Sequence, residues 1–96
     1  MHARVTHLEG SPDRADAGIK MMQEQIIPEA KQIPGFQGGY WCMDRETGKS
    51  MAITLWESLE ALEASEEFAR KLREEAKQEV EAATMQVSVY EVVGQA

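Results

Sequence analysis

Apolar and polar residues alternate along the chain with two different periods, and this pattern predicts strands and helices in a definite order. Residues 3–8, Ala-Arg-Val-Thr-His-Leu, form a short run rich in β-forming residues that ends before Gly10. From Pro12 to about Gln32, apolar residues recur every three or four positions, which predicts a helix with one apolar face. We expect this helix to kink or break at Pro28, because an internal proline removes one backbone hydrogen bond.

The middle of the chain predicts a strand with a local irregularity. Aromatic and apolar residues run from Phe36 to about Asp44. Gly38 and Gly39 interrupt the run, and two adjacent glycines in a strand indicate a bulge or a close approach by another backbone or a ligand. The polar segment that follows predicts a hairpin turn, with Gly48 as the residue of positive φ.

The strand after that hairpin is largely apolar on both of its faces. It runs from Ser50 to Trp56, with Met51, Ile53 and Leu55 on one face. An antiparallel sheet that helices cover on one side alone should have a polar second face. We therefore expect a second copy of the sheet to cover the remaining face, so that the protein is a homodimer.

One more helix and one more strand are predicted in the rest of the chain. The helix begins near Ser58, a favourable N-cap residue, and we expect a short break near Ser65. Its acidic and basic residues indicate a solvated face with ion pairs four residues apart, such as Glu66 with Arg70. Alternating residues over positions 84–93 predict the last strand. Leu62, Ser65, Ala69, Leu72, Ala76 and Val80 form the apolar stripe of this helix.

The predicted order of elements, strand-helix-strand-strand-helix-strand, is that of the ferredoxin-like α+β fold. Right-handed crossovers then give a four-stranded antiparallel sheet with both helices on one face. The 96 residues suit one domain, residues 1–96, and no repeat or linker divides them.

Composition narrows the classes of function. The formal net charge of −7 disfavours nucleic acids and acidic membrane surfaces as partners. No apolar run approaches the roughly 18 residues of a membrane span, so we expect no membrane segment. The first residues show no secretory leader and the chain has one cysteine, Cys42, which together predict a cytoplasmic protein. We expect Cys42 to be a buried, unreactive thiol.

Three residues are candidates for catalysis: His7, Tyr40 and Trp56. The ordinary pKa of histidine lies near neutrality, so His7 could act as a general base on a phenol; the alternative is an ordinary strand histidine. Trp56 is either a wall that stacks on an aromatic substrate or a core residue under the second helix. Tyr40 could hydrogen-bond a phenol or be structural, and it points to the opposite face of its strand from Trp41.

Two further expectations concern charge and metal binding. Arg4 lies on the face of its strand opposite His7, and we expect it to pair with a carboxylate on a neighbouring strand, such as Glu91. His2 and His7 lie five residues apart on an extended segment, which matches no usual metal-ligand spacing. No phosphate-binding loop is present. The sequence therefore predicts neither a metal nor a cofactor.

Three short motifs stand out along the chain: Ile33-Pro34-Gly35-Phe36, Asp44-Arg45-x-Thr47-Gly48 and Trp56-Glu57-Ser58-x-Glu60-Ala61. Together they resemble the antibiotic biosynthesis monooxygenase superfamily. The resemblance implies a dimeric α+β barrel, in which the sheets of two subunits pack face to face and each subunit has a pocket between its sheet and its helices. It also implies oxidation of a small aromatic or polyphenolic substrate by molecular oxygen without a cofactor, with Trp56 and Tyr40 as the aromatic part of the site.

The sequence departs from the active branches of that superfamily. It contains no asparagine, which both branches tend to use, and Ser65 stands where many members have a helical histidine. Heme degradation would therefore lack its iron ligand. A protein that binds a small apolar or aromatic ligand without turning it over is the main alternative, and a dimeric module with no small-molecule role is also open.

Overall fold

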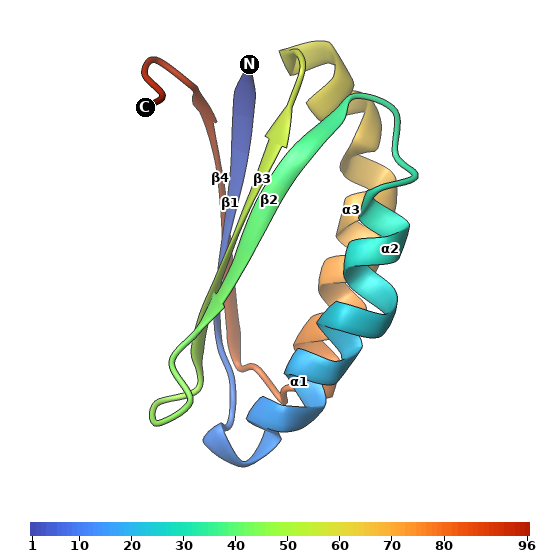
Figure 1. The fold of residues 1–96 in the computed structure, drawn as a ribbon. Coiled ribbons are helices and arrows are strands. Elements are labelled where there is room, and N and C mark those ends of the chain that lie inside the picture. The colour runs from blue at the N-terminus through green and yellow to red at the C-terminus, as the bar shows by residue number, and fades with distance from the viewer.

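A four-stranded antiparallel sheet and a layer of helices on one of its faces make up the structure (Figure 1). The computed structural model describes residues 1–96, and the order of the strands across the sheet is β2-β3-β1-β4. This arrangement confirms the predicted ferredoxin-like α+β fold. None of the helices combines the length and the apolar character that crossing a bilayer requires. The strands are β1 (His2–Glu9), β2 (Phe36–Met43), β3 (Lys49–Trp56) and β4 (Thr84–Glu91).

The first helical segment changes its winding three times. Its parts are η1 (Pro12–Arg14), a 3-10 turn, then α1 (Ala15–Met21), η2 (Met22–Ile26), a π turn, and α2 (Ile27–Ala30). Pro28 lies in the first turn of α2, directly after the π turn. The missing N–H of proline disturbs the regular hydrogen-bond ladder, and a π turn is one way for a helix to absorb such a disturbance. The helical segment therefore does not break at Pro28, and the irregularity next to this residue is a π turn.

Helix α3 (Leu59–Glu79) is continuous, so the predicted break near Ser65 is wrong. The Ser65 hydroxyl donates a hydrogen bond of 2.6 Å to the Leu62 carbonyl one turn earlier, which satisfies it without interrupting the helix. The predicted N-cap is confirmed, because the Ser58 side chain accepts a hydrogen bond of 3.0 Å from the Ala61 N–H.

The predicted irregularity in β2 is a bulge at its glycines. The pairing of β2 with β3 shifts register between Phe36 and Gly38, and Gly38 has a φ of +133°. A Cβ atom at Gly39 would lie 2.6 Å from the Ile53 carbonyl oxygen, so the backbone of β3 approaches too closely for a side chain there. Gly48 has a φ of +80° in the hairpin, as expected.

The pairing register sorts the side chains of the sheet onto two faces. Arg4 is paired with Thr54 and Thr6 with Ala52, and these positions face the helices. The intervening positions point away, since successive side chains of a strand alternate. The helix-free face is therefore mostly apolar, and it carries Ala3, Val5, Tyr40, Cys42, Met51, Ile53, Leu55 and Tyr90.

Cys42 is exposed, so the prediction of a buried thiol is wrong. The residue alternates with Trp41 and Met43, which face the helices, and it lies on the face that no helix covers. The apolar character of β2 was correctly recognised, but the face on which Cys42 lies decides its exposure.

Candidate functional site

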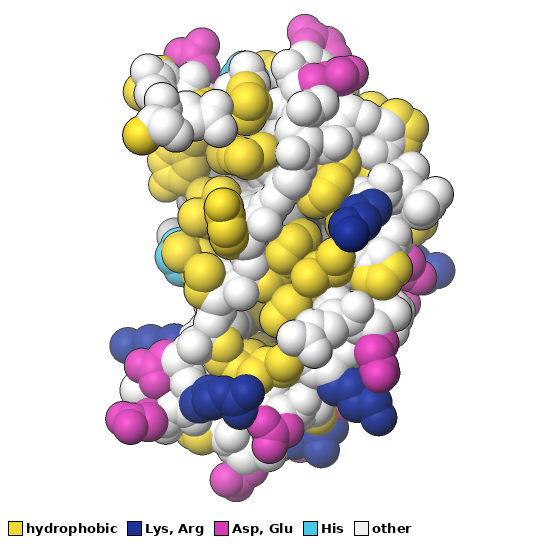
Figure 2. Space-filling view, in the orientation of Figure 1, with side chains coloured by type: hydrophobic (Ala, Val, Ile, Leu, Met, Phe, Trp, Pro, Cys, Tyr) yellow, Lys and Arg dark blue, Asp and Glu magenta, His cyan; other side chains and the backbone are white.

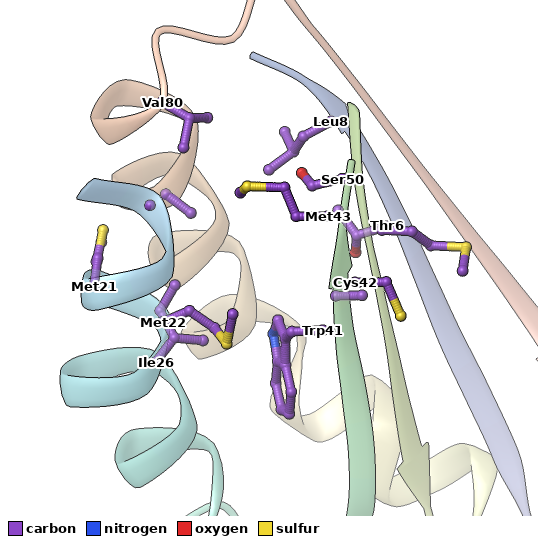
Figure 3. A pocket seen from close by; sticks show the side chains of 14 residues that line it. Thr6, Leu8, Met21, Met22, Ile26, Trp41, Cys42, Met43, Ser50 and Val80 are labelled. Atoms are coloured by element: carbon purple, nitrogen blue, oxygen red, sulfur yellow. The ribbon is translucent and has the colours of Figure 1, made fainter. Parts of the chain in front are cut away.

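A cavity of about 100 Å³ lies between the helix-facing side of the sheet and the helices, and a second cavity of about 70 Å³ adjoins it. Figure 3 shows the smaller one, with the Trp41 ring pointing from β2 toward Met22 and Ile26 of the helical layer. Hydrophobic side chains are visible in the furrow between β2 and the helices in Figure 2, so apolar surface reaches the exterior there. Both cavities are bordered by Thr6, Leu8, Ile26, Trp41, Ala52 and Ala76.

Two tryptophans form the aromatic wall of the larger cavity, Trp41 from β2 and Trp56 from the end of β3. Trp56 is 1% exposed, and its ring meets the Phe36 ring edge-on at 5.6 Å between centroids. Its indole N–H donates a hydrogen bond of 3.0 Å to the Thr54 hydroxyl. The core interpretation of Trp56 therefore holds and the residue also borders the cavity, whereas its stacking on an aromatic substrate stays a prediction.

Arg4 crosses from the sheet to α3 through the protein interior. Arg4 is 3% exposed. Its guanidinium carbon lies 5.4 Å from the centroid of the Trp56 ring, a distance typical of a cation–π contact. The Nη2 group donates hydrogen bonds of 3.0 Å to the Leu62 carbonyl and to the Ser65 hydroxyl. The same nitrogen lies 2.8 Å from a carboxylate oxygen of Glu66. Arg4 thus fastens β1 to the first half of α3.

The predicted pairing of Arg4 with Glu91 is wrong. In the register of β1 with β4, Arg4 is opposite Val89 and Glu91 is opposite His2. The Arg4 side chain extends from the sheet toward α3, where its guanidinium group pairs with the Glu66 carboxylate. The prediction that Arg4 and His7 face opposite sides of β1 is confirmed.

Glu66 is shared by two arginines. One of its oxygens contacts Arg4, and the other accepts a hydrogen bond from Nη2 of Arg73, two turns further along α3. The Arg73 side chain is 12% exposed, and it borders the larger cavity together with Arg4. The predicted pair of Glu66 with Arg70 does not form, since the two oxygens of Glu66 contact Arg4 and Arg73 instead.

Sequence analysis did not identify Arg73 and Glu66 as site residues. They were assigned to a solvated charged face of the helix because charged residues usually lie there. Their spacing of seven residues places them on the same side of α3, next to Leu62, Ala69 and Leu72 of the buried stripe. That spacing is the signal that could have identified them.

The charges in this network shift two pKa values. Burial would raise the pKa of Glu66, but the hydrogen bond from Arg73 and the positive charges of Arg4 and Arg73 outweigh it, so this pKa lies below its ordinary value. Burial lowers the pKa of Arg4, and the charge of Arg73 adds to that effect while Glu66 opposes it. Guanidinium groups nevertheless stay protonated in proteins.

The structure does not bring His7, Tyr40 and Trp56 together. Trp56 faces the helices, whereas His7 and Tyr40 lie on the helix-free face, where Tyr40 is 70% exposed. Their neighbours in sequence, Thr6 and Trp41, take the positions at the cavity. A general base at position 7 therefore cannot reach a substrate in the cavity of the same subunit.

Nothing at the cavity is suited to hold a metal or a heme. No three His, Cys, Asp or Glu side chains gather anywhere in the chain to form a metal site. No histidine lines either cavity, so a heme there would lack an imidazole ligand for its iron.

No model of a known protein family matches the sequence. The uncharacterized protein Rv2558 of Mycobacterium tuberculosis is 34% identical over 76 residues, which cover 79% of this chain and 32% of that protein. The chain thus spans about a third of the length of the curated relatives it matches.

Solved structures share the fold at low sequence identity. A monooxygenase from the gene ActVA-Orf6 of Streptomyces coelicolor, in complex with the ligand nanaomycin D, matches with a TM-score of 0.76 at 13% identity over 99% of this chain and 89% of that one. The heme-degrader MhuD of Mycobacterium tuberculosis, with two hemes bound in its active site, matches with a TM-score of 0.75 at 20% identity over 100% and 99%.

A dimeric ferredoxin-like protein from an uncultured marine organism matches with a TM-score of 0.72 at 13% identity, over 99% of this chain and 90% of that one. Another solved structure of this fold is an antibiotic biosynthesis monooxygenase. The chain therefore has the fold of that superfamily, and the resemblance seen in its sequence is confirmed at the level of the fold.

Replacing Glu66 by Gln should destabilise the protein at neutral pH. Because the pKa of Glu66 is lowered in the folded state, its ionised form contributes stability above its ordinary value of 4.5, and that stability is lost as the pH falls through the lowered pKa. We expect a loss of about 1–2 kcal/mol at pH 7, since the carboxylate is half exposed, and a smaller difference at pH 3. Urea unfolding at both pH values measures it.

The matched control is Glu67→Gln, because Glu67 is exposed and makes no ion pair. This control should unfold like the wild type. A difference between wild type and Glu66→Gln that is as large at pH 3 as at pH 7 would contradict the assignment of an ionised, paired Glu66.

Proposed function

We propose that this chain binds a small aromatic molecule in the larger cavity and promotes its oxidation by molecular oxygen without a bound cofactor. The observation that carries the proposal is the character of the cavity, which is mainly apolar, has two tryptophans in its wall and has a few polar groups at one end. The fold shared with a monooxygenase that was solved in complex with the ligand nanaomycin D adds support.

The chemistry needs no external reductant when the substrate supplies the electrons. In the oxidation of an anthrone by oxygen, the methylene carbon loses its two C–H bonds and gains a carbonyl oxygen. One atom of molecular oxygen enters the product, and the other leaves as water together with the two hydrogens. The protein would contribute by holding the ring in a dry cavity in a reactive orientation.

We assign Trp56 and Trp41 to this site as walls against which the aromatic ring packs. Both border the cavity, and the indole faces offer contact area without a charge. We place His7 and Tyr40 at an interface with a second copy of the chain, because both lie on the helix-free face. The candidate catalytic role of His7 and Tyr40 then depends on a site that the second copy completes.

A binding protein that does not turn its ligand over is the second candidate function. The lining of both cavities favours it, since no histidine is available there to take a proton from a phenol. Binding and turnover are separable in the experiment below.

Purified protein, freed of metal with a chelator, should take up oxygen in the presence of anthrone and produce a quinone. Ala76→Leu should reduce ligand binding and uptake at least about tenfold, because Ala76 borders both cavities and the larger side chain fills them. An oxygen electrode and the absorbance of the quinone measure turnover, and fluorescence of the tryptophans measures binding.

Ala64→Leu is the matched control on the same helix, because Ala64 is exposed and lines neither cavity. It should leave uptake and binding unchanged. Binding without uptake above the uncatalysed rate would replace the oxygenase by the non-catalytic binding protein. Equal effects of the two variants would show that the ligand does not occupy the cavity.

We further propose that two copies pack their helix-free faces together as a homodimer. The middle of this face is mostly apolar, and a second identical face would cover that apolar surface. A dimeric protein of the same fold adds support.

Ile53→Glu should convert the dimer into a monomer. Ile53 lies near the middle of the helix-free face, where it is paired with Val5 and Tyr40. A glutamate there would bury an unpaired charge in the dimer interface, which is costly. Sedimentation velocity measures the mass, with Ala64→Glu on the exposed side of α3 as the control. A wild-type protein that sediments with the mass of one chain at micromolar concentration would refute the dimer.

A further inference from the structure

The larger cavity has an excess of positive charge at one end. Arg4 and Arg73 both border it, and Glu66 is the one carboxylate paired with either of them. Two guanidinium groups and one carboxylate leave one positive charge beside an apolar space. The chain as a whole has a formal charge of −7, so this local excess is opposite in sign to the rest of the protein.

Each arginine also uses only part of its donor capacity. All hydrogen bonds and ion pairs of Arg4 and Arg73 within the protein come from their Nη2 groups. The Nε of Arg4 and the Nε and Nη1 of Arg73 are buried without a hydrogen-bond partner in the protein. Buried donors of a charged group are costly when they are unpaired, so a site with three of them is suited to an acceptor that brings negative charge.

The carboxylate that is present does not complete the network. Glu66 is 45% exposed and contacts each arginine through the Nη2 group alone, while the Arg4 side chain is 4% exposed. Trp56 packs against the Arg4 guanidinium and Thr54 lies on the cavity wall, and neither is negatively charged. The Nε of Arg4 and the Nε and Nη1 of Arg73 therefore have no negatively charged partner within the protein.

We propose that the larger cavity takes an aromatic oxyanion, a phenolate or a carboxylate attached to a ring, whose oxygen is held by Arg4 and Arg73 while the ring packs between Trp41 and Trp56. The inference rests on the proposed function, because the ring occupies the same cavity, and it adds the charge state of the ligand. Charge-assisted hydrogen bonds to guanidinium groups supply the selectivity for an anion over a neutral ring.

Such a site would also change the chemistry of a bound phenol. Positive charge in a dry environment stabilises the phenolate relative to the phenol, so the pKa of the bound phenol falls and its proton leaves to solvent. The phenolate is the more electron-rich form and gives up electrons to oxygen more readily. Arg4 and Arg73 would thus favour the reactive form of the substrate although no histidine borders the cavity.

The test uses four small nitrobenzene probes with the full chain. 4-Nitrophenol reports its own protonation state by its visible absorbance, and 4-nitroanisole has the same ring and cannot ionise. 4-Nitrobenzoate and 4-nitrobenzamide form the corresponding pair for a carboxylate. Binding is measured by quenching of tryptophan fluorescence for the wild type, Arg73→Met and Arg70→Met. Arg70→Met is the control, because Arg70 lies on the same helix, is exposed and lines neither cavity.

We expect the wild type to bind one anion of these pairs at least about tenfold more tightly than its neutral partner. If the anion is 4-nitrophenolate, the apparent pKa of the bound phenol should be lower than in solution. Arg73→Met should lose most of this preference while its affinity for the neutral partner stays the same, and Arg70→Met should behave like the wild type. Preference for nitrobenzoate alone would identify the oxyanion as a carboxylate.

Equal affinities for the charged and neutral probes in the wild type, with an unshifted pKa of 4-nitrophenol, would overturn the inference and leave aromatic binding in place. Binding of none of the probes would refute aromatic binding in the cavity and so the proposed function as well. Both results come from the wild type and hold even if Arg73→Met does not fold. An equal loss of preference in Arg70→Met would also overturn the inference, because it would place the anion outside the cavity.

Discussion

The contact of Arg4 with α3 is the interaction on which the rest of the structure depends. A guanidinium group that leaves β1 and enters the interior must find acceptors there, and it finds the Leu62 carbonyl, the Ser65 hydroxyl and the Glu66 carboxylate. These contacts fix the distance between the sheet and the helix along the first half of α3. An aliphatic residue at position 4 would allow the two layers to pack directly on each other.

The cavity follows from that spacing. Three small side chains line the cavity: Ala52 on the sheet, and Ala69 and Ala76 on α3. Trp41 and Trp56 form its aromatic wall. The walls of this space are mainly apolar, and surroundings of low polarity strengthen the field of the two arginines. In the proposed site, selectivity for an anion and the reactivity of a bound phenol would therefore have the same physical origin as the packing of the helix on the sheet.

Periodicity predicted the fold well and the site only in part. The order of elements, the Ser58 cap, the glycine bulge and the irregularity near Pro28 follow from local backbone chemistry, which the sequence carries directly. Alternation placed Arg4 and His7 on opposite faces, yet it could not say which face the helices cover. That choice depends on tertiary packing, and it decides that Cys42 is exposed and that Tyr40 and His7 lie away from Trp56. Glu66 and Arg73 were missed because charged residues on a helix are usually solvated.

The most direct test of the central claim is an NMR titration of the arginine Nε–H signals with the preferred nitroaromatic anion. The signals of Arg4 and Arg73 should shift with one binding constant and exchange more slowly with water, while the signal of Arg70 should stay in place. Shifts confined to exposed arginines such as Arg70, with Arg4 and Arg73 unchanged at saturation, would contradict the claim that these two residues hold an anion in the cavity.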